Sequence, residues 1–185
     1  DLEKVVRHGI PNLIRVGHTF PFVVVAPQCP EGWWWQGLKV SRFLDRVAGR
    51  FHADPARIYV TGISMGGAGV WELVATCPER LAAAAPVCGP YQWFPAERFG
   101  QVPVWCFHGA MDEVVPITDS IRRIREVRKA GGQVRFTVYP DAGHDAWSET
   151  YTNPKLYRWL LAQRLGSHIP CSCGSKRDSH PCRGR

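Results

Sequence analysis

Residues 62–66 read Gly-Ile-Ser-Met-Gly, which places a serine between two glycines at the spacing G-x-S-x-G. In this pattern a sharp strand-to-helix turn holds the serine in a strained backbone conformation, and the glycines avoid collisions with the neighbouring strand and helix. A glycine turn beside a serine is often only a turn, but here a β-branched segment precedes it and a helical segment follows. We therefore interpret Ser64 as a nucleophile, and we expect the backbone N–H of Met65 to donate to an oxyanion.

A serine hydroxyl needs a base to remove its proton, so the pattern predicts an acid and then a histidine further along the chain. Two downstream loops carry such residues, because Asp112 follows one strand-like segment and His144 follows the next. His144 stands beside a glycine in a short loop, which favours it as the general base. We expect Asp112 to hold its tautomer and to stabilise the imidazolium.

Other ionisable residues near these loops have simpler interpretations. His108 is close to the end of its own strand, so we expect it to brace the loop of the acid. Glu113 would point differently from the same loop, and Asp119 is better explained as the start of a helix. We expect Asp141 and Asp145 to shape the histidine loop or to face solvent.

Alternating strands and helices must position these residues. Segments rich in β-branched residues alternate with segments whose apolar residues recur three and four positions apart. We expect strands at 22–26, 57–61, 81–87, 102–107 and 134–139, and helices at 38–51, 68–76, 117–130 and 154–165. The four alanines within 81–87 would also suit a helix. The alternation predicts an open, mainly parallel α/β sheet with helices on both faces and active groups at the carboxyl ends of its strands.

The length of 185 residues suits one domain, which we expect at 1–165, followed by a basic, cysteine-rich and disordered tail at 166–185. The tail also resembles the short zinc-binding SEC-C motif. The residues that carry this resemblance are Cys171, Cys173 and Cys182, with Arg183 at the expected fourth position and His180 as its substitute. A tail without zinc is the expectation, and we expect no metal or cofactor in the domain.

Four segments of the chain carry a wider resemblance. They are Arg-Ile-Tyr-Val-Thr-Gly-Ile-Ser-Met-Gly-Gly at 57–67, Ala-Pro-Val-Cys-Gly at 85–89, Phe-His-Gly-Ala-Met-Asp-Glu-Val-Val-Pro at 107–116 and Ala-Gly-His-Asp-Ala-Trp at 142–147. Together they resemble the bacterial predicted-peptidase or esterase-like α/β-hydrolases, which are similar to polyhydroxybutyrate depolymerases and feruloyl esterases. The resemblance covers about residues 1–165. It implies an α/β-hydrolase fold, ester hydrolysis through an acyl-enzyme intermediate, and the same roles for Ser64, Asp112 and His144. A peptidase with the same triad is an alternative.

The start of the chain departs from the pattern of that family. Such hydrolases carry earlier strands and a His-Gly loop that supplies a second oxyanion donor, whereas residues 1–11 resemble the segment just after that loop. His8 and Gly9 are not a substitute, because no strand precedes them. We therefore expect an N-terminally incomplete hydrolase fold that lacks its first strands. A catalytically inactive scaffold or binding module is the second alternative.

Aromatic residues in loops suggest how a substrate is held. Trp147, three residues after the base, and Trp93 are the candidates for stacking on a sugar or an aromatic acyl group, and covering the core is the alternative for each. The other aromatic residues in such loops are Trp33, Trp34, Trp35, Tyr91 and Phe94. The expected substrate is a small-molecule or polysaccharide-linked ester.

The formal net charge of +7 is concentrated on the predicted helix 117–130 and on the tail. No nucleic-acid-binding pattern accompanies these charges, so we expect no nucleic-acid partner. No apolar run reaches the roughly 18 residues of a membrane-spanning helix. We expect a soluble protein with no membrane partner, secreted if a leader was removed, while seven cysteines leave the redox compartment open.

Overall fold

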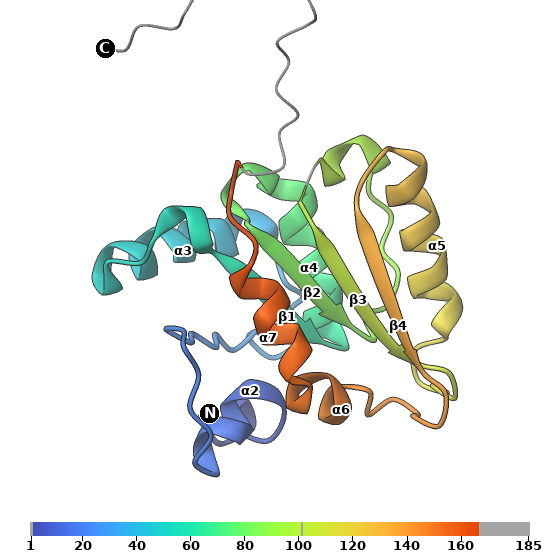
Figure 1. Ribbon diagram of the computed structural model, residues 1–185, viewed down its shortest axis with the longest axis horizontal. Helices are drawn as coiled ribbons and strands as arrows, with labels where there is room; N and C mark the ends of the chain where they lie inside the picture. Colours follow the sequence, from blue (N-terminus) through green and yellow to red (C-terminus); the bar gives the residue numbers. More distant parts are fainter. Residues whose placement is uncertain (1, 101, 167–185) are drawn as a thin grey trace, which may run out of the picture.

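A computed structural model describes residues 2–100 and 102–166, and its centre is one parallel sheet with the strand order β1-β2-β3-β4 (Figure 1). The strands are β1 (Tyr59–Ile63), β2 (Ala83–Val87), β3 (Val104–Gly109) and β4 (Val134–Tyr139). The α-helices are α1 (Leu2–Val5), α2 (Gly9–Arg15), α3 (Gly37–Phe51), α4 (Met65–Thr76), α5 (Ile117–Lys129), α6 (Trp147–Thr152) and α7 (Pro154–Leu161). Every helix in the described part of the chain is too short or too polar to cross a membrane.

The sheet has a hydrophobic core on each face. Successive residues of a strand point to opposite faces, and in β3 Cys106 joins one core while Trp105 and Phe107 join the other. The first core contains residues of α3, α4 and α5, and the second contains residues of α2, α6 and α7. The predicted α/β sheet with helices on both faces is thereby confirmed.

The alanine-rich segment that suited either element is the strand β2. Its residues Ala83, Ala84 and Ala85 are fully buried, and the strand lies between β1 and β3. Ala84 faces the core that contains α4, where its small side chain allows the helix to pack closely over the sheet, while Ala83 and Ala85 face the other core. Burial on both faces of the sheet therefore makes this segment a strand, although its local propensity would also allow a helix.

Several element boundaries differ from those expected. The first turn after Asp54 is a 3₁₀-helix, Pro55–Arg57, in which the Asp54 carboxylate accepts from the N–H of Ala56, so β1 begins at Tyr59 rather than at residue 57. The helix after the serine begins at Met65, three residues earlier than expected. The last predicted helix is shorter and ends at Leu161. The short helix α6 was not predicted, and in its first turn the N–H of Ser148 donates to the Asp145 carboxylate.

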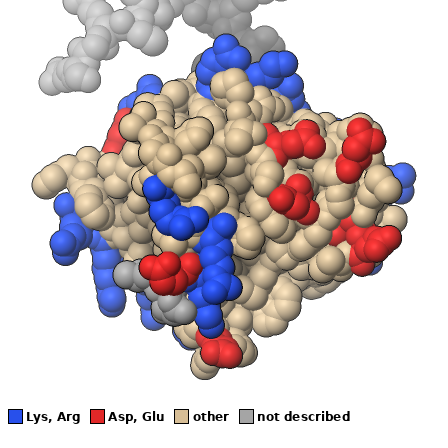
Figure 2. All heavy atoms as spheres, turned by 90° about the horizontal axis from the view of Figure 1, so that it is seen from below, with Lys and Arg blue, Asp and Glu red and all other residues tan. Residues whose placement is uncertain are grey.

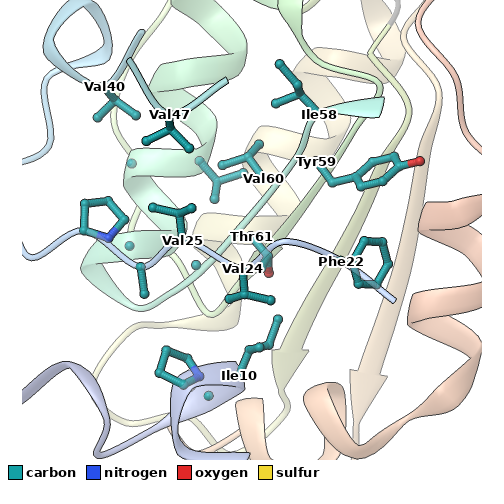
Figure 3. Close-up of a pocket in the computed structure, with 18 of the residues that line it drawn as sticks. Ile10, Phe22, Val24, Val25, Val40, Val47, Ile58, Tyr59, Val60 and Thr61 are labelled. Carbon is teal, nitrogen blue, oxygen red and sulfur yellow. The ribbon is translucent and has the colours of Figure 1, made fainter. Parts of the chain in front are cut away.

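The prediction of a strand at 22–26 is wrong. The segment has no strand partner, and Val23 is 61% exposed. Figure 3 shows Phe22, Val24 and Val25 on one side of an apolar cavity, with Val60 of β1 nearby. The cavity has a volume of about 860 Å³. β-branched residues favour an extended chain, but a strand also requires hydrogen bonds to a neighbour, and here the cavity separates the segment from β1.

Within the described residues, β1 is therefore an edge strand with β2 as its one neighbour. Nothing in the described residues tests the expectation that the first strands of the fold are absent from this chain, so it stays a prediction. The expectations for the tail, both disorder and the zinc motif, concern residues 167–185 and lie outside the described residues.

Candidate active site

The three residues expected to act together lie at the carboxyl edge of the sheet, the lower edge in Figure 1. Ser64 follows β1, Asp112 follows β3, and His144 follows β4. The Nε2 atom of His144 lies 3.0 Å from the Ser64 hydroxyl, and its Nδ1 atom lies 2.8 Å from Asp112 Oδ2. Residues separated by up to 80 positions in the sequence thus form one continuous hydrogen-bonded chain.

The backbone around Ser64 explains the glycines of the motif. Ser64 has φ 51° and ψ −119°, a region that non-glycine residues seldom adopt. A Cβ atom on Gly62 would lie 2.4 Å from the carbonyl oxygen of Gly66, and one on Gly67 would lie 2.6 Å from that of Val87. The turn is therefore open only to glycine at both positions.

The N-terminus of α4 lies directly after Ser64, so its free N–H groups face the nucleophile's turn. The first hydrogen bond of the helix runs from the N–H of Ala68 to the carbonyl oxygen of Ser64. The N–H groups of the residues between them have no acceptor within the helix. Among these is the N–H of Met65, whose role as an oxyanion donor stays a prediction.

The Asp112 carboxylate is buried and accepts several hydrogen bonds. Its side chain is fully buried, its Oδ1 atom accepts from the N–H groups of Val114 and Val115 at 2.9 Å each, and its Oδ2 atom faces His144. Burial opposes ionisation, but the hydrogen bonds from His144, Val115 and Val114 outweigh it and hold the pKa of Asp112 below its usual value. The carboxylate therefore stays charged beside the imidazole.

The proton positions on His144 follow from its neighbours. Because an ionised carboxylate only accepts, Nδ1 must carry a proton toward Asp112, which leaves Nε2 free to accept from the Ser64 hydroxyl. The two loops also support each other, since the N–H of Met111 donates to the carbonyl oxygen of Ala142 at 3.0 Å. A Cβ atom on Gly109 would lie 2.2 Å from the carbonyl oxygen of Gly143, so the close approach of these loops requires glycine there.

Of the two aromatic candidates, Trp147 lies at the site. Its ring packs edge-on against the His144 ring, with 5.3 Å between the ring centroids. The His8 ring packs on the same indole at 5.5 Å. The sequence analysis gave His8 no role, and no local signal brings it here, because α2 packs against α6 only in the folded chain. Trp93 is 71% exposed on the loop after β2, and its contact with a substrate stays a prediction.

Other loop aromatics have structural surroundings. The Trp35 ring fills the space beside Gly69 in α4, so close that a Cβ atom there would be 2.6 Å away. The Tyr91 hydroxyl donates to Glu126, and the guanidinium groups of Arg122 and Arg123 lie over the Tyr91 ring. These contacts join the loop after β2 to α5.

The loop after β2 also corrects the interpretation of Asp119. It lies in the first turn of α5, but its carboxylate accepts from the N–H of Tyr91 across the loop and makes no capping bond at the start of the helix. Glu113 and Asp141 are exposed, and the Asp145 carboxylate accepts from the N–H and the hydroxyl of Ser148. None of these carboxylates contacts the His144 ring in the described hydrogen bonds.

One group of possible metal ligands coincides with the site. Among the described residues, Cys88, Asp112 and His144 place one ligand atom each within 4.8 Å of one another. Asp112 and His144 already bind each other, and burial raises the pKa of the Cys88 thiol to about 12. A cysteine binds a metal ion as its thiolate, and the raised pKa keeps Cys88 protonated. These surroundings therefore do not favour a metal ion here.

The surface around this edge of the sheet is mostly uncharged. Figure 2 views the molecule from the side where the strands end and shows several Asp and Glu groups toward the right, with Lys and Arg mainly at the left and along the top and a few carboxylates among them. Between them lies a broad area of other residues. The site therefore does not sit in a field of one sign.

Sequence comparison relates this chain to known hydrolases. A profile described as the dienelactone hydrolase family matches residues 38–154. A bifunctional acetylxylan esterase/xylanase of Neocallimastix patriciarum is 33% identical over 101 residues, which are 51% of this chain and 15% of that protein. Poly(3-hydroxyalkanoate) depolymerase C of Paucimonas lemoignei is 33% identical over 95 residues, which are 42% of this chain and 23% of that protein. The chain thus spans less than a quarter of either relative.

Solved structures share the fold. A thermostable esterase, 33% identical, superposes with a TM-score of 0.70 over 75% of this chain and 43% of its own. Arabidopsis thaliana SOBER1, 21% identical, superposes with a TM-score of 0.60 over 68% of this chain and 61% of its own. The resemblance to esterase-like α/β-hydrolases and polyhydroxybutyrate depolymerases is confirmed by these matches.

Proposed function

Because this chain belongs to the dienelactone hydrolase family, we propose that it hydrolyses carboxylic esters, with Ser64 as nucleophile, His144 as general base and Asp112 as the residue that orients the base. The observation that carries the proposal is the unbroken pair of hydrogen bonds, 3.0 Å from Ser64 to His144 and 2.8 Å from His144 to Asp112. Distances of this size lie within the range in which a base can remove the proton of a nucleophile.

The proposed reaction begins when Nε2 of His144 takes the hydroxyl proton of Ser64 as its oxygen attacks the acyl carbon. Asp112 stabilises the imidazolium that forms, and the N–H of Met65 donates to the oxyanion. The tetrahedral intermediate collapses as the imidazolium protonates the leaving alcohol, which leaves the acyl group on Ser64. A water molecule, deprotonated by the same imidazole, then attacks the acyl group, and the acid is released as Ser64 regains its proton.

The proposed substrates are small-molecule or polysaccharide-linked esters. The surface around the strand ends is mostly uncharged (Figure 2), which suits an uncharged ester better than a highly charged ligand. Trp147 stands beside the base, where its indole could stack on a sugar or an aromatic acyl group. The names of two relatives, an acetylxylan esterase and a poly(3-hydroxyalkanoate) depolymerase, support ester bonds as the target.

Hydrolysis of p-nitrophenyl acetate and butyrate tests the proposal. We expect Ser64→Ala to lose essentially all turnover above the rate in buffer, since removal of a serine nucleophile from a triad costs about 10⁶-fold in kcat. Ser41→Ala is the matched control and should retain activity. It also removes a serine hydroxyl, but this hydroxyl lies on α3 and accepts from Arg80 rather than facing His144. Equal turnover by the wild type and Ser64→Ala would rule out the proposal. Cleavage of a peptide panel in place of the esters would favour the peptidase alternative.

A further inference from the structure

His108 is a fully buried titratable residue that the proposed reaction does not use. It lies in β3, four residues before Asp112. Its Nε2 atom is 2.9 Å from the carbonyl oxygen of Val115 and 3.2 Å from Asp112 Oδ2, and its Nδ1 atom is 2.7 Å from the Ser120 hydroxyl. Every polar atom of the ring therefore has a partner.

The partners fix which nitrogen carries the proton. A carbonyl oxygen accepts and cannot donate, so Nε2 of His108 must be an N–H, which donates to Val115 and faces the nearby Asp112 carboxylate. The Ser120 hydroxyl can donate to Nδ1, which makes the neutral ring fully satisfied. The same arrangement prevents His108 from acting as a base, because neither nitrogen is free to accept a proton from a substrate or from Ser64.

Asp112 accepts three hydrogen bonds on its two oxygens, and a fourth polar nitrogen, Nε2 of His108, lies close by. The N–H groups of Val114 and Val115 donate to Oδ1, and the Nδ1–H of His144 donates to Oδ2. The Nε2–H of His108 donates to the Val115 carbonyl oxygen, and its nitrogen lies 3.2 Å from Oδ2. Asp112 stands on a loop rather than on a strand, so its carboxylate keeps its direction toward the base only while that loop is held, and the bond from His108 to Val115 holds the loop to β3. His108 belongs to β3 itself, which makes it the donor anchored in the sheet.

We propose that His108 is a positioning residue, which holds the Asp112 loop through the Val115 carbonyl oxygen, with its Nε2–H close to Oδ2, and so keeps the carboxylate at the distance and angle that His144 requires. The proposal rests on the ester-hydrolase function and on Asp112 as its acid. It assigns a second, non-catalytic histidine to the site, because His108 touches neither the nucleophile nor the exposed surface. The sheet thereby orients the acid, the acid orients the base, and the base meets the nucleophile.

Two amide substitutions separate positioning from mere space-filling. The side-chain N–H of a glutamine reaches about as far as Nε2 of histidine, whereas that of an asparagine reaches only as far as Nδ1, on the Ser120 side. His108→Gln should therefore keep a donor near Asp112, and His108→Asn should lose it while it leaves a similar polar side chain in the core. We expect His108→Asn to lower kcat about tenfold or more with KM within about twofold, since the N–H that holds the Asp112 loop is lost while no group that would contact the substrate changes. His108→Gln should recover most of that loss.

Proton NMR supplies a readout that does not depend on turnover. The Nδ1–H of His144, held in a short bond to a carboxylate, should give a low-field signal in the wild type and in His108→Gln. The signal should weaken or shift upfield in His108→Asn. If both variants fold poorly, Ser120→Ala keeps the imidazole and removes its Nδ1 partner, together with a weak contact to the Cys106 thiol, and it should change the same signal in the same direction by a smaller amount.

The outcomes keep this inference distinct from the proposed function. If Ser64→Ala abolishes ester hydrolysis while His108→Asn and His108→Gln match each other in kcat and in the His144 signal, the positioning role is wrong and the esterase proposal stands. If Ser64→Ala retains activity, the function itself fails. In the fallback case, an unchanged low-field signal in Ser120→Ala contradicts the inference.

Discussion

The two ends of the sheet give the proposed site different surroundings. At the β3–β4 end, the loops of Asp112 and His144 are bonded to each other and to the sheet, and the Asp112 side chain is fully buried. At the β1 end, Ser64 borders the apolar cavity of about 860 Å³, across which the segment 22–26 makes no strand. The nucleophile is therefore held mainly by its own turn and by α4, whereas the acid and base are held by a network.

This difference indicates which parts of the site tolerate change. A network of buried hydrogen bonds responds sharply to the loss of one member, because each lost partner leaves a buried polar group unsatisfied. A loosely packed apolar segment responds weakly, because its side chains are already partly in water. Substitutions at the two ends should therefore differ in size by a wide margin.

The largest effect is expected at the acid. Asp112→Asn should lower kcat by about 10⁴-fold, because an amide cannot hold the required tautomer of His144, as found for the same substitution in a serine-protease triad. Kinetics with p-nitrophenyl butyrate measure it. Asp141→Asn, an exposed carboxylate on the neighbouring loop, is the matched control. A loss of less than about tenfold in Asp112→Asn would contradict the assignment of the acid.

The turn of the nucleophile should be sensitive to a single methyl group. In Gly67→Ala the new Cβ would lie 2.6 Å from the carbonyl oxygen of Val87 and 2.8 Å from Cα of Gly89. Since both contacts are backbone atoms, we expect the free energy of unfolding to fall by about 1–3 kcal/mol. Gly66→Ala meets nothing within 4 Å and should change it by less than about 1 kcal/mol. Urea unfolding compares the two variants, and equal stabilities would show that the turn is less tight than described.

Two valine-to-alanine substitutions, one in the core and one beside the cavity, should have smaller effects and compare the packing of the two regions. Val74 of α4 is fully buried, so Val74→Ala should lower the free energy of unfolding by about 2 kcal/mol. Val23 is 61% exposed beside the cavity, so Val23→Ala should change it by less than about 0.5 kcal/mol. The same urea titrations measure both. A loss at Val23 as large as that at Val74 would mean that the segment 22–26 is packed as tightly as the core.

The pH dependence of stability tests the charge of Asp112. Its pKa is lower in the folded protein than in the unfolded chain, so the ionised carboxylate stabilises the fold above the ordinary aspartate pKa of about 3.9. That stabilisation is lost as the pH falls through the folded value. The difference in unfolding free energy between the wild type and Asp112→Asn should therefore shrink from pH 7 to pH 3. A difference that grows toward low pH would have the wrong sign.

The sequence predicted most elements of the fold and the residues of the proposed site. The helix at 38–51 and the strand at 134–139 were found because their periodicity is strong, and the loops of Asp112 and His144 were found because parallel strands end at one edge. The turn at Ser64 was found because only glycine fits beside it.

Other features depend on contacts that the sequence does not reveal. The segment 22–26 has the composition of a strand but no hydrogen-bonding neighbour in the described residues, and composition cannot report the neighbour. His8 reaches Trp147 only because α2 packs against α6. Asp119 has the position of a helix cap, but the loop after β2 brings the N–H of Tyr91 to its carboxylate instead.

Covalent labelling tests the central claim most directly. The folded protein is treated with an alkyl fluorophosphonate, which reacts with activated serine hydroxyls, and the adduct is mapped by peptide mass spectrometry. The account predicts one adduct, on Ser64, whose formation is lost in His144→Ala. An unlabelled Ser64 in the folded protein, or labelling that is equally fast without His144, would contradict it.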